Sequence, residues 1–111
     1  MIQEKMFDIE GKRVFIKQAP ATVGYDVALR YREALGDVEN GIKGDVVEIQ
    51  NCLYELLKYA ELDLGDGRRL PLTSKEVINQ HFTEVSSIMM LQKAVAAVNF
   101  HFLANGETSA S

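Results

Sequence analysis

Apolar residues between Val85 and Leu103 recur at the spacing of three and four positions that is typical of a helix. One stripe consists of Ile88, Leu91, Val95, Val98 and Phe102. A second stripe beside it consists of Val85, Met89, Ala96 and Leu103, with the polar Gln92 and Asn99 in line and Phe100 at its edge. A surface helix in a small domain usually buries one face, so we expect the first stripe to face the internal core and the second to face a partner. The alternative is a central helix that its own domain covers on several sides.

The first 18 residues show the alternation of a β-hairpin. Phe7 and Ile9 precede a tight turn at Glu10-Gly11-Lys12, and Val14 and Ile16 alternate with other residues after it. A lone hairpin is marginal in water, so its apolar face is expected to pack on the helices that follow.

Two helices are predicted next. The first runs from about Pro20 to Leu35, and the glycine-rich run from Gly36 to Gly44 is expected to be a flexible connection. Asp45 followed by Glu48 fits a capping arrangement for the second helix. Its apolar positions fall on one arc, which makes it the expected core helix: Val46, Ile49, Leu53, Leu56, Leu57 and Ala60.

The segment from Leu62 to Leu72 contains a Gly-Asp-Gly turn with apolar residues on both sides. It is therefore either a short second hairpin or a loop packed by its leucines. A capping box at Thr73 to Glu76 opens a short helix before the final one. Together the patterns predict a mainly α fold with a small N-terminal β-hairpin (α+β), arranged as a compact bundle of about four helices. We expect a single domain over residues 1–104, with the hairpin at 5–18, the helical body at 20–104 and a disordered tail at 105–111.

Composition narrows the function classes. The 111 residues are 47% hydrophobic and 25% charged, with a formal net charge of −4, and this acidic balance disfavours a nucleic-acid backbone as partner. Cys52 is the only cysteine, which agrees with a reducing compartment. The N-terminus shows no apolar run with a small-residue cleavage site, and the final helix is too short and too polar for a bilayer span. We therefore expect a cytoplasmic protein.

The residues that could carry chemistry are better explained by structural roles. His81 and His101 lie on different predicted segments, and neither has a metal-ligand partner at helical spacing. Cys52 lies at the flank of the core helix, and we expect a buried or half-buried, unreactive thiol rather than a nucleophile. Asp63 and Asp66 do not match a calcium loop position by position. We predict no catalytic residue, no cofactor and no metal. A two-carboxylate hydrolytic site stays open, but nothing in the spacing of the acidic residues selects a pair.

The predicted partner surface combines the second stripe with an exposed side of the first helix. Tyr25 and Leu29 share that side at i, i+4 spacing. Methionines at 89 and 90 suit an adaptable contact, because the thioether chain is flexible. The candidate partner-binding residues are Tyr25, Leu29, Met89, Met90, Gln92, Asn99, Phe100 and Leu103.

The order of these elements resembles a family. The hairpin F-D-I-E-G-K-R-V-F-I-K at Phe7 to Lys17, the A-P-A turn at Ala19 to Ala21 and the final helix carrying Asn99-Phe100 are similar to the tail assembly chaperones of long-tailed bacteriophages. The resemblance implies a non-enzymatic helper that binds and solubilises the tape-measure protein and helps recruit tail tube protein subunits. Such a protein acts in the bacterial host cytoplasm, is not expected in the mature virion, and could form a homo-oligomer.

The resemblance transfers no catalytic residue and matches no partner-contact residue position by position. Two other classes stay open. A small oligomeric structural or adaptor protein of a phage particle would show the same apolar stripes. A small enzyme would need a polar pocket that joins His81, Cys52 and the dispersed carboxylates.

Overall fold

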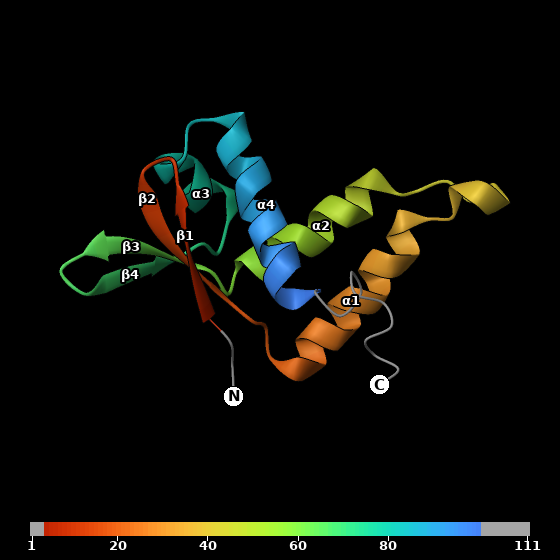
Figure 1. Cartoon of the computed structure of the whole chain (residues 1–111), viewed down its shortest axis with the longest axis horizontal. Coiled ribbons are helices and arrows are strands. Elements are labelled where there is room, and N and C mark those ends of the chain that lie inside the picture. The colour runs from red at the N-terminus through yellow and green to blue at the C-terminus, as the bar shows by residue number, and fades with distance from the viewer. Residues whose placement is uncertain (1–3, 101–111) are drawn as a thin grey trace.

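Four antiparallel strands form one sheet, and two paired helices extend away from it (Figure 1). The structure is a computed structural model that describes residues 4–100. The elements in chain order are β1 (Glu4–Ile9), β2 (Lys12–Lys17), α1 (Ala21–Leu35), the 3₁₀ helix η1 (Val38–Asn40), α2 (Val46–Leu57), β3 (Glu61–Gly65), β4 (Arg68–Pro71), α3 (Lys75–His81) and α4 (Val85–Asn99).

The N-terminal hairpin is confirmed. β1 and β2 pair from Glu4↔Lys17 to Ile9↔Lys12. Glu10 and Gly11 form the turn with φ values of 56° and 75°. Two consecutive positive φ angles give a turn whose twist matches that of the flanking strands, and they leave Glu10 in a conformation that few non-glycine residues adopt.

The prediction of a mainly helical bundle with one small hairpin is wrong. The segment after α2 forms a second hairpin, and its first strand joins β2 through the pairs Val14↔Leu62 and Phe15↔Glu61. The sheet therefore has four strands in the order β1-β2-β3-β4, and the fold is α+β. A run as short as L-D-L does not distinguish a strand from a packed loop, and its partner strand lies more than 40 residues earlier in the chain.

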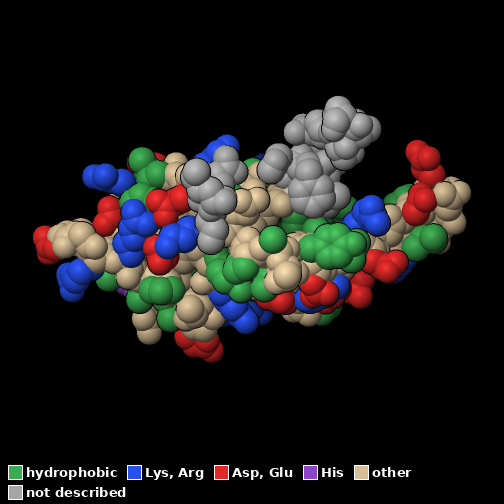
Figure 2. Space-filling model, turned by 90° about the horizontal axis from the view of Figure 1, so that it is seen from below, with side chains coloured by type: hydrophobic (Ala, Val, Ile, Leu, Met, Phe, Trp, Pro, Cys, Tyr) green, Lys and Arg blue, Asp and Glu red, His purple; other side chains and the backbone are tan. Residues whose placement is uncertain are grey.

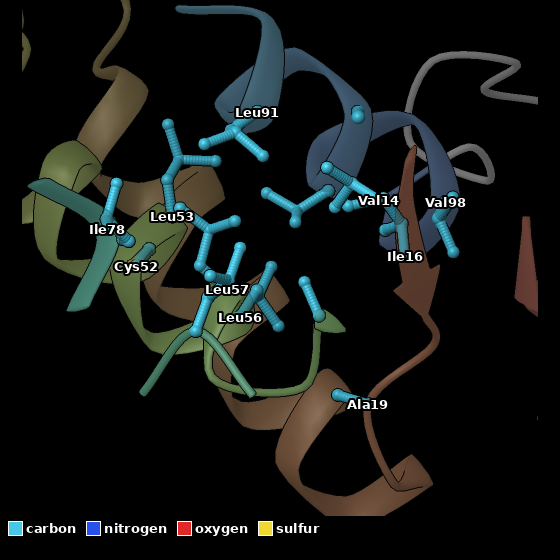
Figure 3. Close-up of a cluster of buried hydrophobic side chains, with 14 of the residues drawn as sticks. Val14, Ile16, Ala19, Cys52, Leu53, Leu56, Leu57, Ile78, Leu91 and Val98 are labelled. Carbon is cyan, nitrogen blue, oxygen red and sulfur yellow. The ribbon is translucent and has the colours of Figure 1, made fainter. Parts of the chain in front are cut away.

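The two faces of the sheet differ. The inner face contributes Val14, Ile16 and Leu62 to a core that also contains side chains from α2 and α4 (Figure 3). The outer face carries charged side chains, where Arg69 lies 2.9 Å from Glu4 and 3.4 Å from Glu61. Such surface ion pairs add little stability, so the core on the inner face determines how the helices are placed.

The core helix is confirmed only in its second half. Leu53, Leu56 and Leu57 are buried, as the pattern predicts. Val46 is instead 70% exposed, because the first turn of α2 extends beyond the sheet and α4, with α1 as its neighbour (Figure 1). We call the projecting end the arm: residues 32–48, which comprise the end of α1, η1 and the start of α2.

The connection inside the arm is an ordered turn, in contrast to the predicted flexible linker. Asp37 and Ile42 exchange backbone hydrogen bonds of 2.8 and 2.7 Å, and the N–H of Asp45 donates to the carbonyl of Ala34. Gly36 has a φ of 73°, and a Cβ there would lie 2.7 Å from the carbonyl oxygen of Ile42. Glycine at this position therefore allows the turn to close against the end of α1.

Candidate partner-binding surface

The first stripe of the final helix faces the core, as predicted. Leu91, Val95 and Val98 of α4 are buried and belong to the core cluster, while Ile88 is half-buried. α4 ends at Asn99. Phe102, Leu103, His101 and the predicted tail at 105–111 lie outside the described residues.

The second stripe divides into an exposed half and a buried half. Met89 is 58% exposed, and Gln92 is half-buried with its Nε2 donating to Gln50 Oε1 at 2.7 Å. Asn99 is buried, where its Oδ1 accepts the N–H of Ala19 at 2.8 Å. Phe100 is also buried and stacks on Tyr31 with ring centroids 4.6 Å apart. Asn99 and Phe100 therefore hold α4 against the rest of this chain, which corrects the expectation that they face a partner.

Two shallow grooves flank the exposed part of α4. The groove toward β1 has a volume of about 310 Å³ and is lined by Phe7, Asp8, Ile9, Met90, Lys93, Ala94 and Ala97. The groove toward α1 and α2 has a volume of about 210 Å³ and is lined by Tyr31, Leu53, Met89, Gln92, Lys93 and Ala96. Alanines form part of both floors, and their short side chains leave the hollows open. Lys93 lines both grooves, so its stem separates them.

Tyr25 and Leu29 are exposed on α1 but do not line the α4 grooves. Tyr25 lines a separate hollow with Ala19 and Asn99. Leu29 shares a groove with Ile42 in the arm. The structure thus divides the predicted surface into the α4 grooves and an α1 side that continues onto the arm.

The start of α4 is held by a side chain from the first hairpin. Glu10 accepts hydrogen bonds from Ser87 Oγ at 2.7 Å and from the N–H groups of Thr83 and Glu84 at 3.1 and 3.2 Å. The Ser87 bond is the largest cause that lowers the pKa of Glu10 to about 2, and the two backbone bonds act in the same direction. A carboxylate at a helix N-terminus also complements the helix dipole, so the hairpin fixes where α4 begins.

Sequence reasoning missed the apolar exposure of the arm. Val38 is 84% exposed and Val47 is 70% exposed, and both lie beyond the reach of the core. The capped start of α2 was visible in the sequence, where Asp45 precedes Glu48, and Asp45 Oδ1 does accept the N–H of Glu48. That cap fixes where the helix begins but does not reveal that its first turn extends beyond the sheet.

Cys52 and Asp63, two of the residues considered for chemistry, have structural surroundings. Cys52 is fully buried, and burial raises the pKa of its thiol, which disfavours the reactive thiolate. Asp63 Oδ1 accepts the N–H of Gly65 and belongs to the β3–β4 turn. Among residues 4–100, no three His, Cys, Asp or Glu side chains lie close enough to hold a metal ion.

Comparison with known proteins does not assign the chain to a family. The chain matches no protein-family model, no curated protein and no solved structure. Within the described part of the chain, no helix has the length and apolar character needed to cross a membrane.

Proposed function

We propose that this protein is a non-enzymatic tail assembly chaperone of a long-tailed bacteriophage. In this role it binds the tape-measure protein, keeps it soluble in the host cytoplasm, and helps recruit tail tube subunits before leaving the particle. The order of the hairpin, the A-P-A turn and the final helix supports the proposal. The observation that carries it is the pair of exposed methionines, Met89 and Met90, which line apolar grooves on the two sides of α4.

The two grooves suit an apolar helical client. Recognition of a helix in a groove needs an apolar floor with a polar rim and no chemistry. Phe7, Ile9 and Ala94 supply apolar floor, and Asp8 and Lys93 supply charged rim. Methionine side chains adapt to different partner shapes, which fits a client that presents many similar segments rather than a single epitope.

Co-expression tests the proposal. A tape-measure protein from the same genome is produced with the wild-type chain, with the Met89→Gln/Met90→Gln variant, or alone, and its soluble fraction is measured. We expect the wild-type chain to raise the soluble fraction and the double variant to lose most of that effect, because glutamine keeps the side-chain length but removes apolar contact. The matched control is Met6→Gln/Leu64→Gln, which changes two exposed apolar residues on the sheet.

A client that is equally soluble with and without this chain would contradict the chaperone role. Equal loss of function in the control variant would contradict the assignment to the α4 grooves.

A small structural or adaptor protein of the phage particle is the second candidate. It is favoured by the separation of the α4 grooves from the arm, because two distinct apolar surfaces allow one subunit to contact two neighbours. Mass spectrometry of purified particles distinguishes the candidates. A chaperone should be absent from the finished particle, whereas a structural component should be present in a fixed ratio to the tube protein.

A further inference from the structure

The arm carries the negative charge excess of the described chain. Its 17 residues include five acidic and two basic side chains, whereas the other described residues carry ten of each. The acidic side chains of the arm are Glu33, Asp37, Glu39, Asp45 and Glu48, and the basic ones are Arg32 and Lys43. Figure 2 shows acidic side chains along the arm at the right of the view, while both charge types alternate over the sheet at the left. The molecule is thus electrostatically polarised along its long axis.

A groove with both apolar and charged lining lies within this acidic region. It has a volume of about 400 Å³ and is lined by Leu29, Arg32, Glu33, Gly36, Asp37 and Ile42. Leu29 is 42% exposed and Ile42 is 58% exposed, so both can bury further surface against a ligand. We call this hollow the arm groove. Leu29 and Ile42 supply its apolar lining, and the acidic Glu33 and Asp37 outnumber the basic Arg32 among its charged side chains.

The arm groove is formed before any partner arrives. The paired backbone bonds between Asp37 and Ile42 hold the turn closed. Arg30 joins α1 to α2, with Nε 2.9 Å from Glu48 and Nη1 3.0 Å from Glu55. A surface that is already ordered loses little conformational entropy on binding, so the groove is suited to recognition.

We propose that the arm groove binds a helical segment of another protein in which apolar residues are flanked by lysine or arginine. The apolar side chains would cover Leu29 and Ile42, and the cations would lie against the acidic side chains of the groove. Complementary charge of this kind provides specificity and accelerates association. A second copy of this chain fits less well, because two arms would bring like charges together and the rest of the described surface has no basic excess.

Fluorescence anisotropy with synthetic peptides tests this inference on the full chain. The probe is a labelled amphipathic helix of leucine and lysine, and its counterpart has glutamate in place of each lysine. We expect saturable binding of the lysine peptide, which weakens as salt is raised because screening shortens the reach of surface charge. The glutamate peptide should bind at least about tenfold more weakly, since like charges oppose each other across the interface.

Two pairs of variants locate the binding site. Leu29→Gln/Ile42→Gln should weaken binding of the lysine peptide by about tenfold through lost apolar burial. Glu33→Gln/Glu39→Gln should weaken it less and should flatten the salt dependence. The matched controls lie away from the arm: Met6→Gln/Leu64→Gln for the apolar pair and Glu76→Gln/Glu84→Gln for the charged pair. Both controls should bind like the wild type.

The inference is overturned by absent saturable binding, by equal affinity for the two peptides, or by equal losses in the controls and the arm variants. Loss of peptide binding in Met89→Gln/Met90→Gln with unchanged binding in the arm variants would also overturn it, because the α4 grooves would then be the site. Thermal unfolding of each variant checks that it is folded. The test uses no tape-measure sequence, so its result is independent of the proposed chaperone role.

Discussion

The body and the arm of this molecule use apolar side chains in opposite ways. In the body, the sheet, α2 and α4 bury theirs together, and Leu56, Leu91 and Val95 are completely shielded from solvent. No residue of the arm belongs to that core cluster, although the arm exposes Leu35, Val38, Ile42, Val46 and Val47. Apolar residues that do not stabilise the fold are free to serve contacts with other molecules. The comparison therefore separates the part that specifies the structure from a part that is available for recognition.

Truncation of a core residue should give the largest change in the stability of the fold. Leu56→Ala removes a fully buried side chain of α2 from the core cluster. We expect a loss of about 2–5 kcal/mol in the free energy of unfolding, from lost burial and from the cavity that remains. Urea denaturation measures it. A loss below about 1 kcal/mol would show that the body does not depend on this cluster.

An intermediate effect is expected at the contact between the hairpin and α4. Glu10→Gln should lower the melting temperature at pH 7, because the charged acceptor of Ser87 and the helix N–H groups is lost. The folded-state pKa of Glu10 is lowered from 4.5 to about 2, so its stabilising contribution is complete above pH 4.5 and disappears as the pH falls toward 2.

Melting curves recorded by circular dichroism between pH 7 and pH 2 test this sign. The difference in melting temperature between wild type and Glu10→Gln should stay constant from pH 7 to about pH 4.5 and narrow as the pH falls further toward 2. Glu76→Gln, which removes an exposed carboxylate from α3, controls for the change in net charge. A difference that stays constant or widens at low pH would contradict the capping role of Glu10.

A substitution in the arm should change the stability of the fold least. Val47→Thr replaces a side chain that is 70% exposed by one of similar shape. The free energy of unfolding should change by less than about 0.5 kcal/mol, as is usual for surface substitutions. A loss comparable with that of Leu56→Ala would break the distinction between arm and body.

The local elements were largely predictable from sequence, whereas the sheet was not. Alternation around Gly11 predicted the first hairpin, and the predicted cap Asp45 marks the start of α2. The N-cap of α3 is Ser74, one residue after the start of the predicted capping box at Thr73. The pairing of β3 with β2 depends on a contact between distant segments, and a three-residue alternation does not specify it. The same limit explains Val46, since periodicity identifies one face of a helix but not how far the neighbouring elements extend.

The sequence predicted only part of the candidate surface, because it does not show which distant residues a side chain contacts. Met89 and Met90 are exposed as expected, because they lie on the sides of α4 that face away from the buried stripe. Asn99 looked like a surface amide, yet it satisfies a backbone N–H at the turn before α1 and so belongs to the interior. A buried polar side chain becomes recognisable only when its hydrogen-bond partner is known.

The bond between Glu10 and Ser87 joins two residues that are 77 positions apart. The N-cap of α4, Glu84, makes no capping bond with its own side chain. The carboxylate of Glu10 instead accepts the N–H groups of Thr83 and Glu84 at this helix start. The capping group that α4 lacks in its own sequence is thus supplied by the first hairpin, so a change in that turn acts on the last helix.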